Sequence, residues 1–160
     1  MLIEVSGDIL LTGAHAIAHG IAPNDNFHQG LALALREEYP AMYKDFRHYC
    51  QLEHPKPGTL WVWAGTKGVR VISLLTQQEA PAHGAHPGKA TTHNVNGALK
   101  ELRALMLEEA FESVALPRLA TGVGGLEWDD VRPLIERHLG DLDTPVYLYT
   151  TFRPGVKAKE

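Results

Sequence analysis

A glycine-rich stretch after an apolar run is the part of the sequence that points most directly to chemistry. It reads SVALPRLATGVGGLEW over residues 113–128, with Gly122, Gly124 and Gly125 ahead of a predicted helix. Backbone N–H groups in such a turn, next to the unpaired amides of a helix N-terminus, can bind phosphate oxygens without lysine or arginine. The same pattern also suits a plain strand-to-helix connection in which glycine only supplies a positive φ.

A second group of polar side chains follows a predicted strand over residues 16–21: Asn24, Asp25, Asn26 and His28. His28 has a suitable pKa for general-base work, and Asn24 or Asp25 could orient a ribose hydroxyl or a water. The cluster could equally consist of turn and cap residues that begin the next helix. Asp8 has two interpretations as well, because it could accept a hydrogen bond from an adenine amino group or belong to an ordinary turn.

Three of the nine histidines, His83, His86 and His93, lie in one segment and raise the question of a metal site. Zinc normally needs three or four protein ligands held on fixed elements. This segment also contains Pro81, Pro87 and two glycines, which is typical of a mobile lid. We therefore expect no metal and no cofactor, and a loop that closes over a ligand.

The elements that must position these residues alternate between strands and helices. Strands are predicted at 2–5, 16–21, 114–116 and 146–149, and helices at 31–39, 41–50, 94–111 and 129–139. Two further apolar runs, 59–65 and 69–75, predict a β-hairpin at or near the centre of the sheet. The pattern predicts a three-layer α/β/α sandwich with a mixed central sheet of about six strands. Ligands of such folds bind beyond the carboxyl ends of the strands, where the loops described above would meet.

Length and composition bound the class of protein. The 160 residues suit one domain, which we expect over 1–152, followed by a frayed polar tail over 153–160. A net charge of -4 argues against general binding to duplex DNA or anionic membranes. Cys50 is the only cysteine, and no stretch reads as a leader or a membrane span. We expect a cytoplasmic monomer.

The order and spacing of these segments resemble the macrodomain family over nearly the whole chain. The matching segments are GDIL at 7–10, AHGIAPNDNFHQGLALALREEYP at 18–40, VISLLTQ at 71–77, PRLATGVGGLEW at 117–128 and VYLYT at 146–150. The resemblance is nearest to the branch that contains the terminal ADP-ribose protein glycohydrolase and the bacterial antitoxin macrodomains that remove ADP-ribose from DNA. Macrodomains bind ADP-ribose, so the resemblance implies an ADP-ribose site here.

The resemblance also implies a role for each part of that site. Asp8 and Ile9 would contact the adenine, with Tyr149 near the adenine face, where an aromatic ring can stack. Gly30 and the start of its helix would lie near the pyrophosphate. The other ligand-binding residues, of which 120–125 would surround the phosphates and the distal ribose, are Ala22, Phe27, Gln77, Leu119, Ala120, Thr121, Gly122, Val123, Gly124 and Gly125.

Two positions depart from the glycohydrolase branch, which has a lysine after the strand corresponding to VISLLT and an aspartate in the phosphate loop. Here these positions hold Gln77 and Gly124. Glutamine cannot form a Schiff base and glycine cannot accept a proton, so the lysine-dependent mechanism does not transfer. Phe27, His28 and Gln29 stand where the family keeps small residues, which would change the mouth of the pocket.

Two function classes remain open. The first is an enzyme that hydrolyses an ADP-ribosyl ester, glycoside or 1″-phosphate, with a water placed by the ligand's own phosphate and by Asn24, Asp25 or His28. The second is a reader that binds ADP-ribose without chemistry, which the missing lysine and aspartate favour. The ADP-ribose could be carried by a protein, a nucleic acid or a metabolite. We favour the hydrolase, and we set aside a dinucleotide-dependent oxidoreductase because residues 121–125 do not read GxGxxG.

Overall fold

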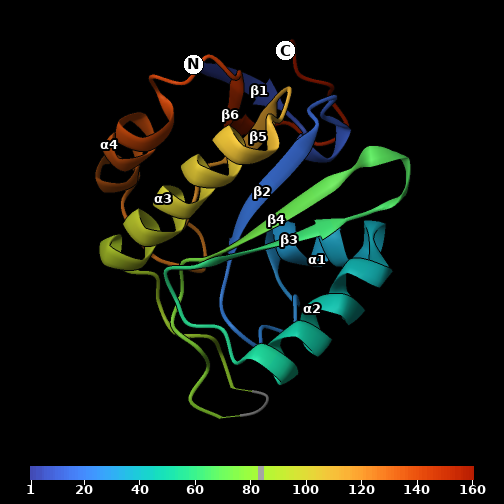
Figure 1. Cartoon of the computed structure of the whole chain (residues 1–160), viewed down its shortest axis with the longest axis vertical. Coiled ribbons are helices and arrows are strands. Elements are labelled where there is room, and N and C mark those ends of the chain that lie inside the picture. The colour runs from blue at the N-terminus through green and yellow to red at the C-terminus, as the bar shows by residue number, and fades with distance from the viewer. Residues whose placement is uncertain (83–84) are drawn as a thin grey trace.

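The computed structural model describes residues 1–82 and 85–160. Within these residues six strands form one mixed sheet, with helices packed on both of its faces (Figure 1). The strands are β1 (Leu2–Gly7), β2 (Ala16–Ile21), β3 (Leu60–Ala64), β4 (Arg70–Leu75), β5 (Val114–Pro117) and β6 (Val146–Phe152). Their order is β1-β6-β5-β2-β4-β3, and every neighbouring pair is parallel except β3 and β4. The predicted three-layer fold is confirmed.

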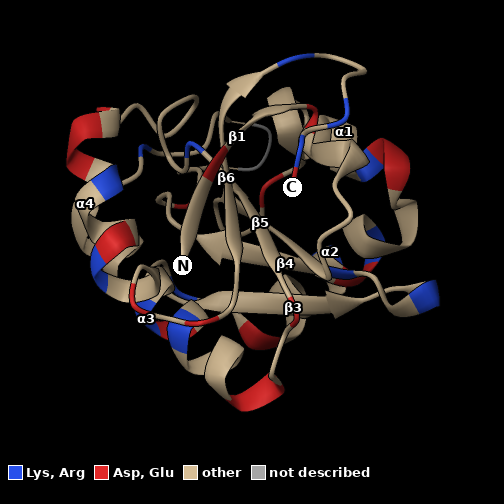
Figure 2. Cartoon of the chain, turned by 90° about the horizontal axis from the view of Figure 1, so that it is seen from above, with Lys and Arg blue, Asp and Glu red and all other residues tan. Residues whose placement is uncertain are grey.

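Each face of the sheet carries its own apolar core. The pair α1 (Gly30–Glu38) and α2 (Pro40–Glu53) covers one face, and α3 (Thr92–Glu109) with α4 (Trp128–Leu139) covers the other. Alternate residues of β2 serve the two cores, because Ile17 packs toward α1 and α2 while Ala18 packs toward α3 and α4. Charged residues lie almost entirely on the helices and loops that surround the sheet (Figure 2). No helix within the described residues is long and apolar enough to cross a membrane.

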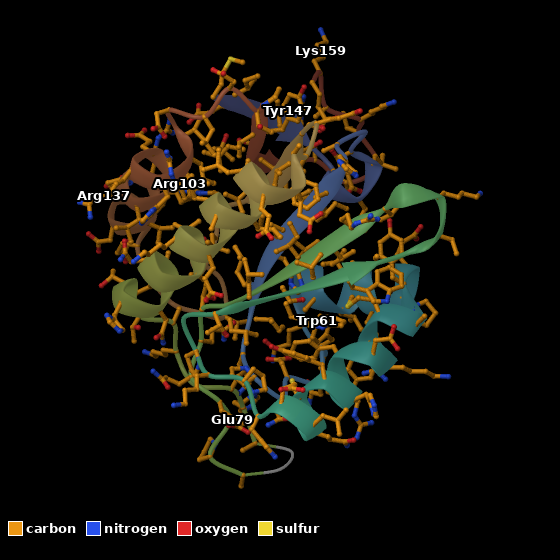
Figure 3. The ribbon with its side chains drawn as sticks, in the orientation of Figure 1. Trp61, Glu79, Arg103, Arg137, Tyr147 and Lys159 are labelled. Carbon is orange, nitrogen blue, oxygen red and sulfur yellow. The ribbon has the colours of Figure 1, made fainter. Side chains whose placement is uncertain are left out.

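The predicted hairpin is present, but its place in the sheet differs from the prediction. β3 and β4 pair antiparallel, and β3 is the edge strand of the sheet and not a central one. Its aromatic residues are covered by α2: Trp61 stacks on Tyr49 with ring centroids 5.5 Å apart, and Trp63 Nε1 donates to Asp45 Oδ2 at 2.8 Å (Figure 3). An edge strand that a helix covers carries as many apolar side chains as a central strand, so sequence alone does not separate them.

The C-terminal residues, expected to be a frayed tail, are docked on the end of β1. We call residues 155–160 the strap. Asp8 N donates to Val156 O at 2.7 Å, and Gly155 N donates to Asp8 Oδ2 at 3.0 Å. Ala158 is buried against Gly7, where an added Cβ would lie 2.8 Å from the Ala158 nitrogen. A short polar segment of this kind gives no periodic signal, because its partners are supplied only by the folded chain.

Candidate functional site

A cavity of about 630 Å³ lies at the carboxyl ends of β2, β5 and β6. Its walls come from the β2–α1 loop, the segment after β4, the loop after β5 and the end of β6. The structure therefore brings three of the four predicted loops to one place. The fourth, Gly7 to Ile9, is not among the residues that line the cavity. The volume is in the usual range for a small-molecule site.

We call the loop after β5, residues 118–125, the phosphate loop. The N–H groups of Thr121, Gly122, Val123 and Gly124 find no protein acceptor among the described residues, and all four residues line the cavity. The loop is closed by bonds from Leu126 N to Ala120 O at 3.0 Å and from Gly125 N to Gly122 O at 3.1 Å. It thus presents a row of free donors, which suits an anionic oxygen.

Two of the three glycines of this loop are required by the backbone of the free protein, and Gly122 is not. Gly125 has a positive φ of 77°, and the non-glycine Ala120 also has a positive φ, of 63°. Because Gly122 has no positive φ, the interpretation in which glycine only supplies a positive φ does not hold at this position, and an added Cβ there would meet nothing within 4 Å. A Cβ at Gly124 would lie 2.7 Å from Ala120 O, so that position requires a close backbone approach.

The start of α1 supplies a second group of amides. Gln29 is the N-cap residue and makes no side-chain capping bond, while Gly30, Leu31 and Ala32 line the cavity. The first N–H groups of a helix have no intrahelical acceptor. They are therefore available to an anion in the cavity, and the role of Gly30 beside a pyrophosphate stays a prediction.

Phe27 is not at the pocket mouth, where we expected it. Its ring is fully buried and packs on His19, Tyr43 and Phe46 with centroids 5.1 to 5.6 Å away. An apolar ring gains more from this core than from a place at the rim, and it anchors the loop from below. Ala22 is likewise buried and does not line the cavity.

The polar residues of the same loop separate into two groups. Asp25 and His28 line the cavity, and Asp25 Oδ1 accepts from Phe27 N at 2.8 Å. Burial raises the pKa of Asp25, against the opposing effect of that bond and of nearby His28. Asn24 does not line the cavity, and its side-chain amide donates to the Glu79 carboxylate. The structure thus keeps two of the three predicted catalytic residues at the cavity.

The segment after β4 brings Gln77 and His86 to the cavity wall. Gln77 is buried, and its Nε2 donates to Gly88 O at 3.2 Å, so the amide is tied to its own segment. His93 begins α3 away from the lining, and His83 lies outside the described residues. Across residues 1–82 and 85–160 no three His, Cys, Asp or Glu side chains are grouped to hold a metal.

The far end of the cavity differs from the expected adenine site. Asp8 and Ile9 do not line it, and the Asp8 carboxylate accepts from Leu10 N at 3.1 Å and from Gly155 N at 3.0 Å. Tyr149 does line it, with its hydroxyl donating to Glu160 at 2.5 Å. Burial and that bond to the Glu160 carboxylate raise the pKa of Tyr149 to about 12.

Sequence reasoning missed several residues that line the cavity, and Phe152 and Arg118 are the two with the most to offer a ligand. Phe152 ends β6 with 68% of its surface exposed, and the available signal was an aromatic residue just beyond the last predicted strand. Arg118 is the only lysine or arginine among the described lining residues, and its guanidinium carbon lies 5.2 Å from the Trp128 ring centroid. Arg118 belongs to the PRLATG segment, but its position in the sequence did not distinguish it from an ordinary surface arginine.

Comparison with known proteins gives the family. The Macro domain family model matches residues 15–135. A DNA ADP-ribosyl glycohydrolase of Mycobacterium tuberculosis is 26% identical over 155 residues, covering 92% of this chain and 42% of that protein. A DNA ADP-ribosyl transferase–DNA ADP-ribosyl glycohydrolase fusion protein of Thermosipho africanus is 26% identical over 157 residues, covering 91% of this chain and 40% of that protein. The chain therefore spans about two fifths of the length of these curated relatives.

Solved structures agree with the sequence match. The macrodomain of Thermus aquaticus DarG superimposes with a TM-score of 0.82 at 25% identity, covering 94% of this chain and 98% of that one. A macrodomain protein of Streptomyces coelicolor gives a TM-score of 0.74 at 24% identity, covering 94% and 99%. With a family model that matches well over half of its length and the same fold throughout, the chain belongs to the Macro domain family.

Proposed function

We propose that the protein binds ADP-ribose in this cavity and hydrolyses the bond between ADP-ribose and its carrier. The observation that carries the proposal is the presence of two groups of free amides, at residues 121–124 and in the first turn of α1, on one cavity. A diphosphate presents two linked anionic groups, and two amide groups can meet that charge without lysine. Arg118 adds one cation at the same cavity.

Asp25 is the proposed general base. Its raised pKa makes the carboxylate a stronger base than an exposed aspartate, and it lines the cavity beside residues of the α1 start. In the step we propose, Asp25 accepts a proton from water as the water oxygen bonds to C1″ of the distal ribose. The bond from C1″ to the carrier breaks with its electron pair going to the carrier, and the carrier takes up the proton that Asp25 received from the water. No covalent lysine adduct forms in this step, because Gln77 lines the cavity at the position where the related branch has its lysine.

The carrier that we propose first is a nucleic acid. The support is in the names of the curated relatives, which are DNA ADP-ribosyl glycohydrolases. A net charge of -4 does not favour broad binding to DNA, so recognition would depend on the ADP-ribosyl group itself. Protein-linked and 1″-phosphorylated ADP-ribose are the alternatives to be compared.

The test is a titration followed by a turnover assay. ADP-ribose is titrated by calorimetry, and the protein is then incubated with thymidine-linked, glutamate-linked and 1″-phosphorylated ADP-ribose for mass spectrometry. The matched variant is Asp25→Asn, which keeps an oxygen for Phe27 N. We expect it to bind ADP-ribose nearly as well as the wild type and to turn over about a hundredfold more slowly.

Two results would change the proposal. Binding of ADP-ribose without turnover of any linkage would identify a reader, which Gln77 and Gly124 in place of lysine and aspartate favour. Absence of ADP-ribose binding would overturn the proposal as a whole.

A further inference from the structure

The strap is fixed by a single carboxylate that three donors share. Glu160 accepts from Gly13 N at 2.9 Å, from the Tyr149 hydroxyl at 2.5 Å and from the Thr12 hydroxyl. These donors belong to the turn after β1 and to β6, which are far apart in sequence. One carboxylate therefore joins the turn that follows β1 to the middle of the neighbouring strand β6.

The other end of the strap is fixed by backbone bonds. Arg153 N donates to Gly7 O at 3.0 Å, Val156 N donates to Arg153 O at 3.1 Å, and Gly155 N donates to Asp8 Oδ2. The turn they form begins directly after Phe152. The direction in which β6 ends is thus set by contacts to β1 and to the strap.

What the strap fixes is the wall at one end of the cavity. Tyr149 and Phe152 both line the cavity, and Phe152 leaves most of its ring exposed there. An exposed aromatic ring on a cavity wall is a stacking surface for a planar base, as in sites that bind nucleobases. The amide groups at 121–124 and at the start of α1 account for the phosphates and leave this end for the base.

We propose that the strap positions the nucleobase end of the ligand site and that Glu160 is the positioning residue that anchors it. The proposal rests on the proposed function for the identity of the ligand, ADP-ribose. Glu160 itself does not line the cavity. It acts through Tyr149 and through the turn that orients Phe152, so that the base meets a wall that is already ordered.

The test compares Glu160→Ala with Lys159→Ala in the full chain. Lys159 is exposed on the same strap and points away from the protein (Figure 3). ADP-ribose and AMP are titrated by calorimetry, and the melting temperature of each variant is recorded. We expect Glu160→Ala to weaken both ligands by the same factor, about fivefold to tenfold, because both contain the adenosine end, while Lys159→Ala binds as the wild type does.

A double-mutant cycle locates the effect. Tyr149→Phe removes the hydroxyl donated to Glu160 and keeps the ring, so we expect a smaller loss than with Glu160→Ala, and no further loss when the two are combined. Additive losses would contradict an action of Glu160 through Tyr149.

Other results of these titrations would contradict either the role of Glu160 or the proposed function. A lower melting temperature with unchanged affinity would make the strap purely structural, and higher affinity would make it an inhibitor; either overturns the inference and leaves the proposed function intact. A Glu160→Ala variant that binds ADP-ribose more weakly but AMP normally would place the effect at the distal ribose and not at the base, and would also overturn the inference. If the wild type binds neither ligand, the proposed function itself fails.

Discussion

At the scale of single residues, the partly buried Asp25 and the buried His19, both at the cavity, have pKa values shifted toward their neutral forms. Burial raises the pKa of Asp25 and lowers the pKa of His19 to about 4. His19 lies on β2, with its Nε2 2.9 Å from Ser73 Oγ. Desolvation disfavours whichever form carries charge, so it shifts an acid and a base in opposite directions.

Asp25→Asn should stabilise the protein at neutral pH. The pKa of Asp25 is raised in the folded state, so between the unfolded pKa and the folded pKa the native protein binds more protons, and stability falls as pH rises through that window. Asparagine does not titrate and keeps an oxygen for Phe27 N. We expect a higher melting temperature than wild type at pH 7 and a smaller difference at pH 3. A destabilised variant at pH 7 would show that the charged carboxylate is compensated by a partner.

His19 should make the protein sensitive to acid between pH 6.5 and 4. The folded pKa lies below the unfolded value of 6.5, so the unfolded chain binds the proton first and stability is lost as pH falls through this window. The 2.5-unit difference corresponds to about 3 kcal/mol at pH 4. Urea unfolding of wild type and His19→Asn at pH 7 and pH 4 tests this, because the variant should lose less stability between the two. Equal losses would assign the acid sensitivity to other groups.

At the scale of elements, the sequence predicted the helices and strands that have a regular spacing of apolar residues. α3 carries Val95, Leu99, Leu102 and Met106 at helical spacing, and its existence followed from that stripe. The place of β3 in the sheet did not follow, because Trp61 and Trp63 are partly covered by residues of α2 and not by a further strand. The burial of Phe27 and the docking of the strap were also missed, since both depend on partners brought together only by folding.

The phosphate loop should respond differently at two neighbouring glycines. Gly122→Val meets open space in the free protein and needs no positive φ, so we expect a normal melting temperature and loss of ADP-ribose binding as the side chain fills the cavity. Gly124→Ala places a Cβ 2.7 Å from Ala120 O, and we expect it to lower stability by about 1 to 3 kcal/mol. Thermal unfolding and calorimetric titration of both variants separate the effects. Normal binding by Gly122→Val would remove this loop from the site.

The same crowding bears on any attempt to restore the lysine and aspartate of the related branch. Gly124→Asp would strain the loop whether or not its carboxylate reached a substrate. Gln77→Lys replaces a side chain whose hydrogen bond within the described residues is to Gly88 O. We expect Gln77→Lys to fold and the double variant to be less stable than Gln77→Lys alone, as measured by thermal unfolding. Equal stability of the two would show that the loop relaxes.

At the scale of the whole molecule, ligand binding should appear as added thermal stability. A ligand that binds only the folded state at 100 times its Kd adds about 2.7 kcal/mol, which corresponds to about 5 to 10 °C for a chain of this length. ADP-ribose should raise the melting temperature more than AMP at equal concentration, because only ADP-ribose reaches both amide groups. Equal shifts would confine binding to the adenosine end.

The pairing of β1 with β6 has a consequence for the order of folding. β1 is an outermost strand, and its one neighbour in the sheet is the last strand of the described fold. During synthesis β1 leaves the ribosome well before β6, so it stays without its sheet partner until β6 has been made. Loop closure over this span is slow compared with local helix formation. We therefore expect the β1–β6 ladder, with the strap over it, to be the last part of the sheet to assemble. It would then pack on α3 and the strands that have already formed.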